Sequence, residues 1–160
     1  MKHLSVPRPF AACIFLCLMA LPALAAEPAD ISGRWKFKTG VLQNKGCVIS
    51  GEIEFRKAVK PFDYACTFTS REDCDRDPPT FTEVKQSCMA RVTGDDIAIT
   101  SKVEKITDAG PEFFKQQMFA SQAYQADNFI VRWEKGSLIG LFHSLRQATV
   151  RFWRDVDLVS

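Results

Sequence analysis

The chain has 160 residues, 46% hydrophobic and 25% charged, a composition that suits one globular domain. Two of its 21 Lys and Arg residues lie in the first 26 residues, whereas all 19 Asp and Glu residues follow, so the remainder is formally neutral. Neutrality argues against a nucleic-acid binder or a polybasic membrane-surface protein, because both need clustered positive charge. Only His143 follows position 26, which excludes paired catalytic histidines and multi-histidine metal sites there.

Residues 1–26 have the pattern of a secretory signal peptide. Two cationic residues precede a short apolar run, which ends in Leu-Pro-Ala-Leu-Ala-Ala. Small residues at such a position are typical of signal cleavage, so we expect cleavage after Ala25 or Ala26. The exported product, 27–160, is predicted to be a single domain without a membrane anchor, in a bacterial periplasm or secreted.

After the predicted signal peptide, apolar and polar residues alternate over several short segments. This period of two predicts antiparallel strands that bury one face. In chain order, the first five such segments are 31–38, 47–56, 62–68, 84–92 and 97–103.

Residues 111–123 depart from this alternation. Pro111 opens the segment, and the apolar residues that follow it have helical spacing, which predicts a short amphipathic helix over one end of the sheet. An irregular crossover is the alternative. Three more strands are predicted after it, at 124–134, 137–144 and 147–154.

Eight strands with mostly short connections favour an all-β fold, a single eight-stranded antiparallel up-and-down barrel. Closure removes the exposed strand edges that an open meander would leave. A two-sheet sandwich is the alternative. In the barrel, Trp35 is expected to point inside.

Four cysteines remain after export, and an even count in an exported chain predicts two disulfides. The hairpin around the Asp/Pro loop places Cys66 opposite Cys88. The preceding hairpin places Cys47 opposite Ser70, at the end of the sheet from which the loop bearing Cys74 departs. The predicted pairs are therefore Cys47–Cys74 and Cys66–Cys88.

No catalytic or metal-binding motif is recognisable. Asp73, Asp75 and Asp77 have the spacing of a calcium loop, but its sixth-position Gly and its final Glu are missing. His143 and Ser144 are neighbours on a predicted strand and point to opposite faces, so they cannot act together. We expect no metal and no cofactor, although an enzyme with an unrecognised carboxylate-based site remains an alternative.

Three polar residues, Gln86, Ser101 and Ser144, are expected on inward faces of the barrel. Such groups could orient a small apolar ligand in a cavity. They could equally bond one another or buried water in a filled core. A carrier of a small apolar ligand is therefore an alternative function.

The start of the domain resembles calycin-type barrels such as lipocalins. These open their first strand with Gly-x-Trp and lay an Arg from the last strand across the indole, a pattern that Gly33, Trp35 and either Arg151 or Arg154 match. The resemblance implies a lipocalin-like barrel with these residues at its kernel.

A closer resemblance is to the small periplasmic inhibitors of secreted bacterial metalloproteases, which also open with a Ser-Gly-x-Trp strand followed by a Cys, here Cys47. The resemblance implies that the residues before the first strand enter a protease cleft. The leading hypothesis is accordingly a non-catalytic exported binding barrel that resembles protease inhibitors, with a secreted protease as its partner. Its partner-binding tail would be Ala26, Glu27, Pro28, Ala29 and Asp30.

Overall fold

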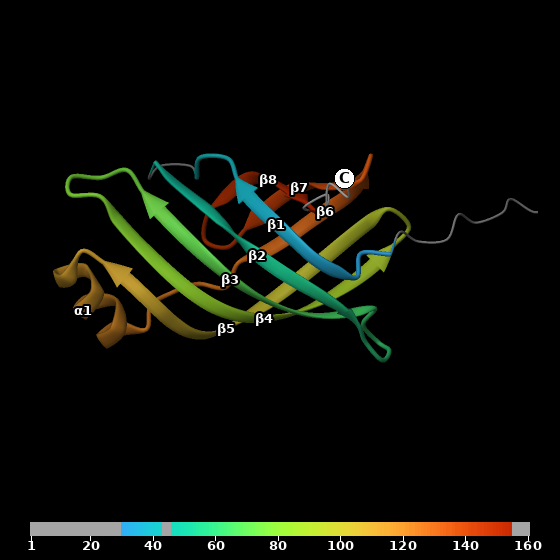
Figure 1. The fold of residues 1–160 in the computed structure, drawn as a ribbon, viewed down its shortest axis with the longest axis horizontal. Helices are drawn as coiled ribbons and strands as arrows, with labels where there is room; N and C mark the ends of the chain where they lie inside the picture. Colours follow the sequence, from blue (N-terminus) through green and yellow to red (C-terminus); the bar gives the residue numbers. More distant parts are fainter. Residues whose placement is uncertain (1–29, 43–45, 155–160) are drawn as a thin grey trace, which may run out of the picture.

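The structure is a computed structural model that describes residues 30–42 and 46–154. Eight antiparallel strands follow one another around a closed barrel, with one helix beside it (Figure 1). The prediction of an all-β, eight-stranded up-and-down barrel is thus confirmed, and the sandwich alternative is wrong. The predicted signal peptide and residues 26–29 of the predicted tail lie outside the described residues.

The elements have short connections and run in simple chain order. They are β1 (Gly33–Thr39), β2 (Cys47–Lys57), β3 (Tyr64–Cys74), β4 (Thr80–Thr93), β5 (Asp96–Gly110), α1 (Glu112–Ser121), β6 (Asn128–Glu134), β7 (Ser137–His143) and β8 (Gln147–Trp153).

Strands β3, β4 and β5 run further than the alternation predicts. Ser70, Glu72 and Cys74 continue the inward face of β3, and Thr80 and Thr82 begin that of β4. These residues are mostly polar, so the apolar signal stops before the strands do. Because β6 pairs with β5 only over the first residues of β5, the three long strands project beyond the rest of the barrel.

Helix α1 packs against β5 at this projecting end. It occupies most of the predicted segment 111–123, and none of its residues is fully buried. The strand predicted at 124–134 begins only at Asn128, because 122–127 form an irregular segment whose Asp127 bonds to Ser70 of β3 and Gln86 of β4. Among the described residues, no helix has the length and apolar character needed to cross a membrane.

Aromatic side chains fill the middle of the barrel. Their ring centroids lie 5.2–6.0 Å apart, and the rings meet mostly edge to face, a favourable geometry for aromatic contacts. All are buried. The cluster consists of Phe37, Phe68, Phe129, Phe142 and Phe152.

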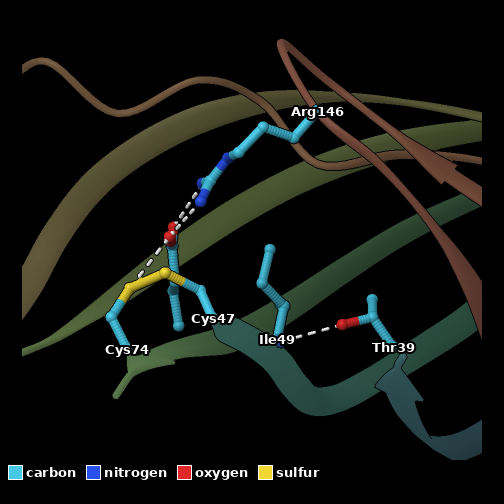
Figure 2. The surroundings of a disulfide bond; sticks show 6 residues. Thr39, Cys47, Ile49, Cys74 and Arg146 are labelled. Carbon is cyan, nitrogen blue, oxygen red and sulfur yellow. Dashed lines mark hydrogen bonds and ion pairs between the residues drawn. A yellow bond between two sulfur atoms is a disulfide. The ribbon is translucent and has the colours of Figure 1, made fainter. Parts of the chain in front are cut away.

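Both predicted disulfides, Cys47–Cys74 and Cys66–Cys88, are present. Cys66 lies opposite Cys88, as predicted, but Cys47 lies opposite Cys74 rather than Ser70. The turn between β2 and β3 is centred two residues later than predicted, which shifts the register by four residues. Figure 2 shows the Cys47–Cys74 bridge near the barrel end.

Gly140 allows β6 and β7 to approach closely, because a Cβ there would lie 2.1 Å from the Ile130 carbonyl oxygen. Backbone atoms cannot move aside as a flexible side chain can. We expect Gly140→Ala to lower the free energy of unfolding by about 1–3 kcal/mol, as overpacking does. Urea unfolding measures this, and a loss below about 0.5 kcal/mol, the size of a neutral surface change, would contradict the close approach.

Candidate functional site

A pocket of about 430 Å³ lies at the end of the barrel beside α1. We call it the helix-end pocket. It lies between the projecting ends of β3 and β4, the helix, the segment 122–127 and the turn that joins β7 to β8. Its lining includes Thr80, Phe114, Met118, Tyr124, Ser144 and Arg146.

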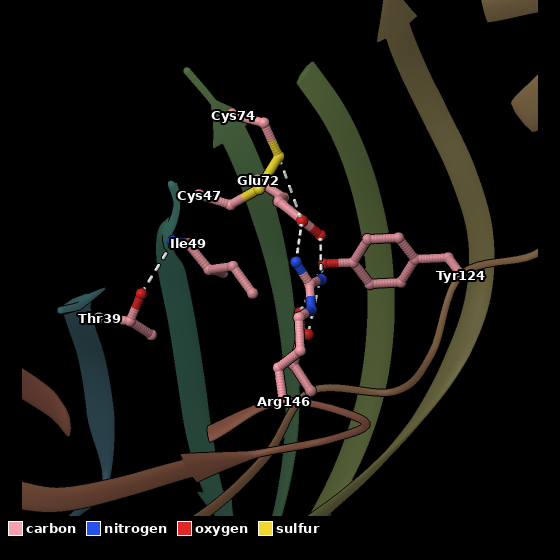
Figure 3. Close-up of polar contacts among 8 residues, drawn as sticks. Thr39, Cys47, Ile49, Glu72, Cys74, Tyr124 and Arg146 are labelled. Carbon is pink, nitrogen blue, oxygen red and sulfur yellow. Dashed lines mark hydrogen bonds and ion pairs between the residues drawn. A yellow bond between two sulfur atoms is a disulfide. The ribbon is translucent and has the colours of Figure 1, made fainter. Parts of the chain in front are cut away.

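An ion pair between a half-buried Arg146 and a buried Glu72 lines this pocket. The two guanidinium nitrogens of Arg146 lie 2.5 and 2.8 Å from the two carboxylate oxygens of Glu72. The hydrogen bonds that Arg146 donates to the Glu72 carboxylate raise the pKa of Arg146. Figure 3 shows the Tyr124 hydroxyl pointing toward this pair, with the Cys47–Cys74 bridge above Glu72 in the view. Both oxygens of the Glu72 carboxylate are therefore occupied by a permanent cation.

Asp127 lies deeper and is only 1% exposed. Its Oδ2 accepts hydrogen bonds from Ser70 Oγ (2.8 Å), Gln86 Nε2 (2.6 Å) and the Tyr124 hydroxyl (3.2 Å). Burial raises the pKa of Asp127 to about 6, and the negative charge of Glu72 acts in the same direction. The hydrogen bonds oppose this shift because they favour the ionised form.

The Asp127 cluster ties segment 122–127 to the barrel wall. The Asp127 backbone N–H donates to Gln86 Oε1 at 3.0 Å, and the Ser101 hydroxyl donates to the Asp127 carbonyl. Burial also raises the pKa of Tyr124, which keeps its hydroxyl protonated as a donor. The cluster therefore holds the loop in place, and Asp127 itself does not line the pocket.

The three predicted cavity groups are separated by the structure. Gln86 and Ser101 both bind Asp127, whereas Ser144 lies in the β7–β8 turn and lines the helix-end pocket. Sequence reasoning missed Glu72, Tyr124, Asp127 and Arg146. Continuing the β3 alternation past Phe68 would have placed Glu72 inward; the other three lie in loops, which carry no periodic signal.

At the opposite end of the barrel, the Cζ atom of Arg154 lies over the Trp35 ring, 4.4 Å from its centroid. The Trp35 Nε1–H donates to the Ile31 carbonyl at 2.9 Å, and Gly33 has the positive φ of +102° that the chain needs there. Arg151 instead lies near Ser137 Oγ, at 3.4 Å. Of the two candidate arginines, Arg154 is therefore the one that covers the indole.

Arg154 also holds the chain just before β1. One of its nitrogens donates to the carbonyls of Asp30 and Ser32, at 2.9 and 3.0 Å. The Asp30 carboxylate accepts from the Ser32 N–H and the Tyr64 hydroxyl and pairs with Lys57. The hydrogen bonds that Ser32 donates to the Asp30 carboxylate, and to a smaller extent the one from Lys57, hold the pKa of Asp30 well below its usual range. We call these five residues the N-terminal clamp.

One group of potential metal ligands stands out among the described residues. The Sγ atoms of Cys47 and Cys74 and a carboxylate oxygen of Glu72 lie within 4.8 Å of one another. Both sulfurs are joined in the disulfide, and Glu72 is paired with Arg146. In this oxidised form the group has no thiolate to offer a metal.

Comparisons with known proteins add no assignment to this geometry. No protein-family model matches the chain, and no curated protein matches its sequence. Because one fold can host many functions, function has to be argued from the sites themselves.

Proposed function

We propose that this protein is a non-catalytic binding barrel exported to a bacterial periplasm, and that it inhibits a secreted metalloprotease with the segment ahead of its N-terminal clamp. The clamp is the observation that carries the proposal. Two disulfides suit the oxidising compartment that the proposal requires.

A terminal segment can fill a substrate cleft efficiently only when its point of departure is fixed, because ordering a free chain costs entropy on binding. Asp30 is held through its carbonyl by Arg154 and through its carboxylate by Lys57 and Tyr64. Asp30 thus belongs to the clamp, and the inserting part of the predicted tail is limited to Ala26, Glu27, Pro28 and Ala29.

The filled interior weighs against a carrier that holds an apolar ligand inside the barrel. Phe37, Phe129 and Phe152 pack with their ring centroids 5.2–5.3 Å apart in the middle of the barrel. A ligand would have to displace such rings, which pack as tightly as an ordinary core.

The carboxylate cluster gives little support to an enzyme. Glu72 and Asp127 have opposed environments, one paired with a cation and one desolvated, as acid–base pairs do. Asp127, however, is almost completely buried, and its Oδ2 accepts from three side chains. A substrate cannot reach it within hydrogen-bond distance, which general acid–base catalysis requires.

Deleting residues 26–29 while keeping Asp30 should abolish inhibition of a secreted zinc metalloprotease. The free energy of unfolding should change by no more than about 0.5 kcal/mol, because the clamp contacts, which begin at Asp30, are kept and the ends of a domain usually contribute little to stability. Inhibition is measured by hydrolysis of a peptide substrate at micromolar protein, and stability by urea unfolding. A tail of equal length made of Gly and Ser should also fail to inhibit.

The matched control is Asp30→Ala, which keeps the tail and the carbonyl contact with Arg154 but removes the carboxylate contacts with Ser32, Lys57 and Tyr64. It should inhibit more weakly than the intact protein but better than the deletion. If the deletion inhibits as well as the intact protein, or if the intact protein inhibits no such protease, the inhibitor proposal is wrong.

A further inference from the structure

We propose that the helix-end pocket binds a small carboxylate that has an apolar or aromatic body. This site lies at the opposite end of the barrel from the N-terminal clamp. It does not depend on protease inhibition, and the two proposals can fail separately.

The pocket has the size and walls of a small-molecule site. Its volume of about 430 Å³ falls in the range of roughly 300–1,000 Å³ that is usual for ligand sites. Phe114 and Met118 lie on the half-buried inner face of α1, and Leu145, at the rim, is 80% exposed. These apolar side chains stay partly exposed to water in the folded protein. Burying them under an apolar ligand would therefore contribute favourably to the free energy of binding.

Three hydroxyl groups in the pocket lining have no hydrogen-bond partner among the residues that the structure describes. Thr80 and Thr82 point inward from the start of β4, and Ser144, in the β7–β8 turn, lines the same pocket. In the described part of the chain none of these hydroxyls takes part in a hydrogen bond, and none is sealed from solvent. They are therefore free to donate to a ligand oxygen.

The charges that line the pocket favour an anion. Both Glu72 oxygens are taken by Arg146, so a cationic ligand would find no unpaired carboxylate in the lining. Arg76 also lines the pocket, and within the described residues it has no ion pair or side-chain hydrogen bond. Its neighbours Asp75 and Asp77 are not part of the lining. A free guanidinium beside free hydroxyls matches the acceptors of a carboxylate.

Isothermal titration of the exported protein with three molecules of one shape tests this assignment. The probes are 4-phenylbutyrate, 4-phenylbutanol and 4-phenylbutylamine, at neutral pH and low salt. The carboxylate should bind about tenfold more tightly than the alcohol, as expected when one charged hydrogen bond is added. The amine should bind more weakly than either. Equal binding of all three, or no binding of the carboxylate at 10 mM, would overturn the proposal.

Substitutions then locate the site. Arg76→Gln should weaken binding of 4-phenylbutyrate about tenfold while leaving the alcohol unchanged, because only the anion uses the guanidinium. Thr82→Val, which keeps the shape of the side chain, should weaken the carboxylate and the alcohol. Arg151→Gln changes an exposed arginine that does not line the pocket, so it is the matched control and should change neither. Binding that is insensitive to Arg76→Gln and Thr82→Val would place the ligand elsewhere and refute the assignment.

Discussion

Replacing Trp35 by Ala should lower the free energy of unfolding by about 3–5 kcal/mol, the usual cost of emptying a large aromatic site in a core. The indole is 1% exposed and meets Trp133 edge to face at 5.8 Å. It also supports the Arg154 guanidinium and donates to the Ile31 carbonyl. Alanine would remove all of these contacts and leave a cavity that the surrounding strands can close only in part.

Urea unfolding, followed by far-ultraviolet circular dichroism, measures this loss. Ile130→Ala is the matched control, because Ile130 is 54% exposed on β6 and should cost less than about 1 kcal/mol. Trp35→Phe should fall between the two, since it keeps a ring but leaves the Ile31 carbonyl without its donor. A loss below about 1 kcal/mol for Trp35→Ala would mean that the indole is not part of the core.

The barrel could be predicted because its strongest determinants are periodic. Residues such as Trp35, Ile53 and Phe68 alternate with polar neighbours, and a period of two fixes which side of the sheet they take. The cysteines added a second constraint, which gave the correct disulfides even though the β2–β3 register was wrong by four residues. The predicted register placed Cys47 four residues from Cys74 along the neighbouring strand, and the true register places the two cysteines directly opposite each other. The error therefore did not change which cysteine is nearest to Cys47.

The helix-end pocket could not be predicted in the same way. Its inward residues on β3 and β4, Glu72, Thr80 and Thr82, are polar and therefore look like outward or loop residues. Tyr124 and Arg146 come from loops, whose course is set by tertiary contacts rather than by local pattern. The apolar alternation stops where the inward residues of the projecting strands become polar. These polar residues line the pocket, so the pattern that predicts strands is absent at the site.

The polar interior also predicts an unusual dependence of stability on pH. Asp127→Asn should make the protein more stable than wild type above pH 7, by up to about 3 kcal/mol. Burial raises the pKa of Asp127 from 3.8 to about 6, so the folded state holds this proton more tightly than the unfolded state. The resulting stability is fully present below about pH 4 and is lost as the pH rises through about 6. Asn stays neutral at every pH, so it avoids the cost of a buried charge.

The difference between the variant and wild type is the quantity to measure, because other carboxylates act in the opposite direction. Hydrogen bonds and ion pairs lower the pKa of Asp63, Asp96 and Asp108, so these groups stabilise the folded state above about pH 4 and lose that effect in acid. Their contribution cancels between two proteins that differ only at Asp127. Urea unfolding from pH 4 to pH 8 should show a difference that grows from pH 4 to about pH 7 and then levels off, because Asp127 is fully ionised in both states above that pH. A flat difference for Asp127→Asn would mean that this carboxyl ionises in the folded state as easily as in the unfolded one, and the cluster with Ser70, Gln86 and Tyr124 would then have to be open to water.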